Sequence, residues 1–127
     1  AGNRIATCTL RKEGSYDLTS DEMLLRRGLG DRGFADTPSS FDAPIEVCAL
    51  MGELNYLTRL TCADGSRPWG KDLDKAHAAR VGTGTGRSRC GHPNFPIIDH
   101  YVAPCPEKRY DIYMDMYECG PGERLRQ

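Results

Sequence analysis

The residues of this chain that could carry out acid–base chemistry are its three histidines, His77, His92 and His100. His92 falls in a predicted loop, where functional side chains concentrate, and His100 follows Asp99 on a predicted strand. Neighbouring strand residues point to opposite faces of a sheet, so Asp99 is not placed to pair with His100. With another carboxylate, His92 and His100 could catalyse hydrolysis as general acid and base, or could bind a metal.

His77 has a simpler interpretation. It lies in a predicted helix, residues 71–81, on the same stripe as Leu73 and Val81. We therefore expect an ordinary half-buried ring at this position. The serine-nucleophile motif G-x-S-x-G and the zinc motif H-E-x-x-H are both absent, and we predict no cofactor and no metal site.

Arginine and glycine alternate with small residues between positions 80 and 89. The segment contains Arg80, Arg87 and Arg89, three glycines and no acidic residue. We predict an irregular glycine loop over residues 82–91, whose backbone N–H groups and arginines could hold an anion. The P-loop pattern G-x-x-x-x-G-K-[ST] is missing, so a nucleotide is not indicated. Anion or small-ligand binding at residues 80–89 is therefore a second hypothesis.

The clearest alternation in the sequence lies in a predicted strand over residues 110–118. Apolar Ile112 and Met114 alternate with polar residues, as in a half-buried antiparallel strand. The polar face carries Tyr113, Asp115 and Tyr117, together with Asp111. Tyrosines beside carboxylates are a plausible interface composition, so we predict that this face binds another protein.

Six cysteines are the strongest feature of the composition: Cys8, Cys48, Cys62, Cys90, Cys105 and Cys119. Their number is even and no C-x-x-C pair occurs, which favours three disulfides over a zinc or redox motif. Disulfides persist in oxidising compartments, so we expect a secreted or periplasmic protein, with six reduced cytosolic cysteines as the alternative.

A sequential pairing is the simplest connectivity: Cys8 with Cys48, Cys62 with Cys90, and Cys105 with Cys119. It conflicts with the predicted C-terminal hairpin. Ten strand residues span roughly 30 Å, whereas paired Cα atoms lie about 6 Å apart. A straight hairpin and a Cys105–Cys119 bond therefore exclude each other.

The remaining elements follow from local patterns. Residues 45–62 fit two structures, either two strands joined at Gly52-Glu53 or a helix over residues 43–60. The others are a strand over residues 4–10, a helix over 20–27, a long loop over 28–44, a strand over 97–103 and a turn over 104–108. We predict an α+β fold, with two helices and an antiparallel sheet of four to five strands cross-linked by disulfides. The whole chain, 1–127, forms one domain with a flexible tail at 120–127.

The charge balance and the hydropathy pattern give no support to two classes of partner. The net charge of -1 gives no bulk attraction to nucleic acid, and no apolar run is long enough to insert into a membrane. Small size, disulfides and the tyrosine face favour an exported binding protein that recognises another protein, as an inhibitor or an envelope component. A secreted hydrolase and an anion-binding protein are the alternatives, and the sequence does not indicate an oligomeric state.

Overall fold

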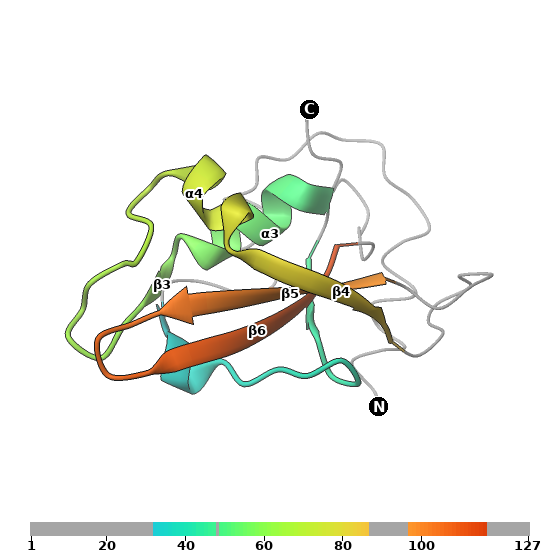
Figure 1. Cartoon of the computed structure of the whole chain (residues 1–127), viewed down its shortest axis with the longest axis horizontal. Coiled ribbons are helices and arrows are strands. Elements are labelled where there is room, and N and C mark those ends of the chain that lie inside the picture. The colour runs from blue at the N-terminus through green and yellow to red at the C-terminus, as the bar shows by residue number, and fades with distance from the viewer. Residues whose placement is uncertain (1–31, 48, 87–96, 117–127) are drawn as a thin grey trace.

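The structure is a computed structural model that describes residues 32–47, 49–86 and 97–116. Within these residues the fold is α+β, with two helices, one sheet of four strands and one of two strands (Figure 1). The predicted strand at 4–10, the helix at 20–27, the tail at 120–127 and a Cys8–Cys48 bond lie outside the described residues. Neither described helix is long and apolar enough to cross a membrane.

A C-terminal hairpin forms the centre of the larger sheet. Strands β5 (Ile97–Pro104) and β6 (Arg109–Asp115) are antiparallel, with His100 opposite Tyr113 and Tyr101 opposite Ile112. The predicted strands and turn are confirmed here. The period-2 pattern placed Ile112 against the core, and it is buried there.

The strand β4 (Arg80–Thr85) pairs antiparallel with β5, where the sequence predicted an irregular loop. Over residues 82–85 that prediction was wrong, because it gave weight to the glycines and not to the β-branched Thr83 and Thr85 between them. Residues 87–91 of the predicted loop lie outside the described residues. The neighbouring strand β5 supplies the hydrogen bonds that keep this glycine-rich segment extended. A register shift between Arg80 and Gly82 marks a bulge at the start of the strand.

The strand order in the larger sheet is β2-β6-β5-β4. The short strand β2 (Ile45–Glu46) runs parallel to β6, so the sheet is mixed and not purely antiparallel as predicted. Two further short strands, β1 (Arg32–Gly33) and β3 (Leu60–Thr61), pair with each other in parallel.

The segment after β2 is a helix, α3 (Ala49–Leu57), and the two-strand alternative is excluded. Its Leu54 and Leu57 are buried at helical spacing beside Glu53. The second helix, α4 (Leu73–Ala78), begins at Asp72, whose side chain accepts hydrogen bonds from the N–H groups of Asp74 and Lys75. It is shorter than predicted because the chain enters β4 directly afterwards.

Both helices lie on one side of the β5–β6 hairpin, where they bury the core (Figure 1). The short 3-10 helix η1 (Phe34–Asp36) closes one end, where Phe34 packs edge-on against Trp69 and stacks on Tyr110. The buried residues of this core are Phe34, Val47, Leu54, Tyr56, Leu57, Leu60, Cys62, Trp69, Ala76, Tyr101, Ala103, Cys105, Ile112 and Met114.

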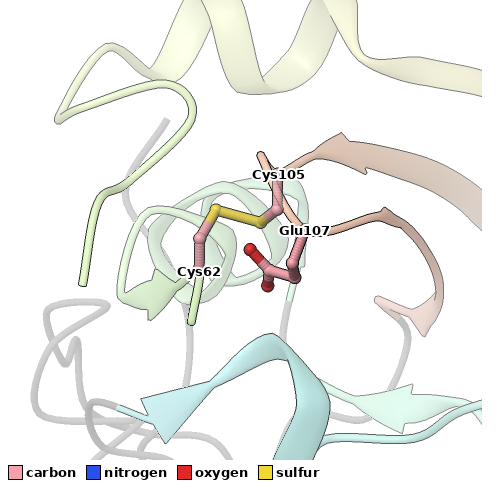
Figure 2. A group of neighbouring side chains, drawn as sticks. All are labelled: Cys62, Cys105 and Glu107. Atoms are coloured by element: carbon pink, nitrogen blue, oxygen red, sulfur yellow. A yellow bond between two sulfur atoms is a disulfide. The ribbon is translucent and has the colours of Figure 1, made fainter. Parts of the chain in front are cut away.

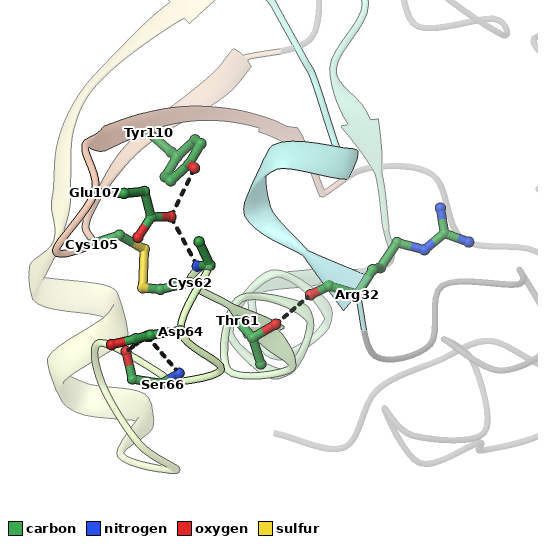
Figure 3. The surroundings of a disulfide bond; sticks show 9 residues. Arg32, Thr61, Cys62, Asp64, Ser66, Cys105, Glu107 and Tyr110 are labelled. Carbon is green, nitrogen blue, oxygen red and sulfur yellow. Dashed lines mark hydrogen bonds between the residues drawn. A yellow bond between two sulfur atoms is a disulfide. The ribbon is translucent and has the colours of Figure 1, made fainter.

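One disulfide joins the two sheets. Cys62 follows β3 and Cys105 lies in the hairpin turn, with their Cα atoms 5.5 Å apart (Figure 3). The predicted bonds of Cys62 with Cys90 and of Cys105 with Cys119 are therefore wrong. The straight hairpin, which excluded the second of these bonds, leaves Cys105 at the turn, where the end of β3 comes within reach.

Candidate functional site

Three polar and aromatic side chains meet on the face of the sheet that is turned away from the helices. His100 on β5 stands opposite Tyr113 on β6, and their rings stack with centroids 4.4 Å apart. Asp111 lies two residues before Tyr113 on the same face, and its Oδ1 is 2.8 Å from His100 Nε2. The antiparallel register thus supplies the carboxylate partner that Asp99 could not provide.

A fourth residue completes this outer face. Phe41 comes from the segment between η1 and β2, and its ring lies 4.6 Å from that of Tyr113 and 6.2 Å from that of His100. Gly84 makes room for it, since a Cβ there would come within 2.5 Å of the Phe41 ring. The N–H of Tyr113 donates to Ser39 Oγ at 2.9 Å, which ties the same segment to the edge of β6.

The hydrogen bond to Asp111 determines what the His100 ring can do. An ionised carboxylate only accepts, so Nε2 carries the proton and Nδ1 is left as an acceptor in the neutral ring. The side chain of His100 is 22% exposed and that of Asp111 is 61% exposed. The pair is therefore reachable from solvent, and it has the arrangement of a general base with its orienting carboxylate.

A second cluster of ionisable groups lies on the inner face of the sheet. Glu53 on α3 is fully buried, and the Tyr101 hydroxyl donates to its Oε1 at 2.7 Å. Asp99 is also buried and lies 3.6 Å from a guanidinium nitrogen of Arg80, at the rim of the sheet. Two carboxyl groups thus share one apolar interior with a single arginine.

The Glu53 carboxyl is protonated at neutral pH. Burial, and then the neighbouring carboxylate of Asp99, raise its pKa from 4.5 to about 9. Its Oε2 is buried without a hydrogen-bond partner of good geometry in the described structure. The same environment, burial first and then Glu53, raises the pKa of Tyr101. Both side chains are buried between α3 and the sheet, so we assign them a role in the stability of the fold and not in catalysis.

A third group includes the disulfide: the sulfur atoms of Cys62 and Cys105 and a carboxylate oxygen of Glu107 all lie within 4.8 Å of one another (Figure 2). Both sulfur atoms are used in the disulfide, so neither is a thiolate that could bind a metal. The Glu107 carboxylate accepts from the N–H of Ala63 at 3.0 Å and from the hydroxyl of Tyr110 at 2.8 Å (Figure 3). The group therefore has a structural role: it connects the hairpin turn to the end of β3.

The residues predicted to carry function are brought together only in part. His100 and Tyr113 meet on the outer face, whereas Asp115, expected on the same accessible face, is fully buried where β2 pairs with β6. Arg80 lies on a strand and pairs with Asp99. His77 is half-buried on α4, as expected. The candidates His92, Tyr117, Arg87 and Arg89 lie outside the described residues.

Phe41 was not expected on the outer face, and Asp111 was expected there but not as the partner of His100. The diagonal contact from His100 to Asp111 depends on the register of the hairpin, which the turn over residues 104–108 could have suggested. Phe41 reaches the face from a separate segment. The one signal for it in the sequence was the run of glycines in β4, which leaves room for an aromatic ring. Comparisons with known proteins assign no family, since no family model, curated protein or solved structure matches the chain.

Proposed function

We propose that this chain is an exported, disulfide-stabilised domain that recognises another protein through the outer face of its four-stranded sheet. The observation that supports this most is the contact among Phe41, His100 and Tyr113, three half-buried rings on a face that neither described helix covers. Rings that are partly exposed and already held in place lose little conformational freedom on binding, and aromatic residues dominate the binding energy of protein interfaces.

The distribution of charge on this face also favours a protein partner. Asp111 at its margin is hydrogen-bonded to His100, so this carboxylate already has a polar partner within the described face. A polar margin around an apolar centre is the usual arrangement of a protein interface.

Export to an oxidising compartment is supported by the Cys62–Cys105 bond. We propose that the other four cysteines form two further disulfides. Alkylation of the denatured, unreduced protein followed by mass measurement should then find no modified thiol. Six modified thiols would overturn the proposed compartment.

Site-specific photo-crosslinking tests the recognition of a protein. A benzophenone amino acid replaces the exposed Asp111 on the outer face or, as the control, the exposed Asp74 on α4. In cells that express the chain, we expect one defined adduct from position 111 and none from position 74. Unlabelled wild-type chain should suppress that adduct, whereas the variant Tyr113→Ala should not. Equal adducts from both positions, or equal competition by both chains, would refute recognition through this face.

Hydrolysis is a second candidate function, favoured by the 2.8 Å contact between His100 and Asp111. In this mechanism Nδ1 of His100 takes a proton from water or from a nucleophile, and Asp111 stabilises the imidazolium that forms. The purified chain would be assayed on ester, peptide, oligosaccharide and RNA substrates. We expect His100→Ala and Asp111→Asn to lower turnover by about 100-fold or more, with Tyr113→Phe as the active control. Turnover that survives both substitutions, or no turnover at all, would exclude this mechanism.

A further inference from the structure

We infer that the partner, if the chain recognises a protein as proposed, adds an extended segment to the free edge of β4 and places an aromatic side chain over Gly82. Strand β4 is the last in the sheet order, and no described strand pairs with its outer edge. Unpaired backbone groups along a strand edge are a template for one more strand.

The hydrogen-bond pattern shows which residue faces the free edge. The N–H of Tyr113 points away from β5 to Ser39, so Tyr113 and His100 form a non-hydrogen-bonded pair. His100 therefore directs its backbone groups toward β4, where Gly82 is its partner. Because the pattern alternates, Thr83 directs its N–H and C=O outward, away from β5.

The exposure of β4 is consistent with an edge that can accept one more strand. Five of the six residues of β4 are exposed. The exposed large hydrophobic residues of the described chain are Val81 on β4 and Ile97 on β5. Ile97 pairs with Thr85 and Val81 lies at the bulge, so the two residues mark the opposite ends of this edge. A strand added to β4 would lie along Gly82, Thr83 and Gly84, between these two ends.

Gly82 leaves an open position on the outer face. A Cβ built there meets nothing within 4 Å, whereas one at Gly84 meets the Phe41 ring. A partner residue opposite Gly82 would form a non-hydrogen-bonded pair, in which side chains lie closest. Its side chain would cross Gly82 toward His100, whose other flank is already stacked on Tyr113. Aromatic residues commonly cover a glycine across a strand pair in this way.

The charges around this position favour an uncharged ring over an acidic or basic side chain. Asp111 is already hydrogen-bonded to His100, and Arg80 already has Asp99 as its partner, so a charged partner residue would lose its hydration without meeting an unpartnered counter-charge. Phe, Tyr or Trp can instead stack on the ring of His100 and continue the aromatic cluster.

Two substitutions separate the edge from the pocket. In Thr83→Pro the lost N–H is the one that faces outward, so the ladder to β5 is kept while strand addition is blocked. In Gly82→Val the new side chain enters open space, and Gly82 has no positive φ that would strain it. It fills the position meant for the aromatic ring and leaves the backbone edge free.

The probe is a phage library of random linear dodecapeptides, selected on the full oxidised chain, with single peptides then measured by fluorescence anisotropy. We expect selected peptides to share one aromatic position, whose replacement by Ala weakens binding about fivefold or more. Thr83→Pro should abolish binding of these peptides. Gly82→Val should remove the difference between the aromatic and the Ala peptides.

Selected peptides that bind Thr83→Pro as well as the wild type, or that lack a shared aromatic, would overturn the inference. The photo-crosslink at position 111 separates its failure from that of the proposed function. If the adduct persists in Thr83→Pro, the chain recognises a protein without adding a strand at β4. An adduct between two copies of the chain would also overturn the inference, because the occupant would then be the chain itself.

Discussion

The buried carboxyl of Glu53 should make the protein less stable as the pH rises through neutrality. Its pKa in the folded protein, about 9, is higher than its ordinary value of 4.5. Between these two values the folded chain holds a proton that the unfolded chain has lost. The stabilisation is therefore complete below about pH 4.5 and decreases as the pH rises toward 9.

The size of this effect follows from the shift in pKa. A group of this kind lowers the free energy of unfolding by about 1.4 kcal/mol per pH unit within the window. Between pH 5 and pH 7.5 the loss is therefore on the order of 3 kcal/mol, a large part of the 5–15 kcal/mol that is typical of a domain. The exposed carboxyls whose pKa is lowered, such as that of Asp64, lose their contribution only at more acidic pH.

Glu53→Gln is the matched test, since the amide keeps the shape of the protonated acid. Its oxygen can still accept from the Tyr101 hydroxyl, and its N–H₂ can donate to Asp99. Urea unfolding with the disulfides intact would be followed by the fluorescence of Trp69, the single tryptophan, which is buried. We expect wild type and Glu53→Gln to be about equally stable at pH 5, and the variant to be on the order of 3 kcal/mol more stable at pH 7.5.

Tyr101→Phe provides a control for this experiment. It removes a hydrogen bond that lowers the pKa of Glu53, so the free energy of unfolding should still decrease as the pH rises. The variant should be less stable than the wild type at every pH. An equal pH dependence in wild type and Glu53→Gln would refute the reasoning. It would mean that Glu53 is ionised in the folded protein.

Further predictions concern the disulfide and the glycines of β4. Replacing Cys62 and Cys105 together by Ala opens a loop with a sequence separation of 43 and should cost about 4 kcal/mol on the chain-entropy model, measured by urea unfolding against the oxidised wild type. A cost near zero would contradict the expected contribution of the Cys62–Cys105 bond to stability. Gly84→Ala should destabilise the fold by about 1–3 kcal/mol, because its Cβ collides with the Phe41 ring, whereas Gly82→Ala should be neutral within about 0.5 kcal/mol by the same measurement. Equal costs at the two glycines would show that Phe41 does not lie over β4.

Local pattern was sufficient for the C-terminal hairpin. Alternation in residues 110–118 predicted both the strand and its buried face, because period 2 with Ile112 and Met114 on one side matches only a half-buried strand. The same alternation showed that Asp99 and His100 face opposite sides of the sheet. The α+β class and the helix α4 also followed from the sequence, whereas α3 was left open between a helix and a strand pair.

Tertiary structure decided the elements for which two local structures were nearly equal. Leu50, Leu54 and Leu57 fit both a helix and a strand pair, and burial against the hairpin selected the helix. The glycine-rich sequence of β4 has only a weak local preference for a strand. It forms one because β5 supplies hydrogen-bond partners for its backbone.

Contacts between distant segments lay beyond any local pattern. The Cys62–Cys105 bond requires the end of β3 to meet the hairpin turn, and the contact of His100 with Asp111 requires one register of β5 on β6. Spacing along a chain determines how far two residues can be apart, but not which of the permitted neighbours they meet. The two strands of the hairpin and the burial of Ile112 and Met114 were thus determined by the sequence, whereas the burial of Asp115 on the other face was decided by β2. The pairing of the strands was decided only by the tertiary structure, because it depends on contacts between segments far apart in the sequence. This pairing forms the aromatic face, buries Glu53 and leaves the edge of β4 free among the described strands.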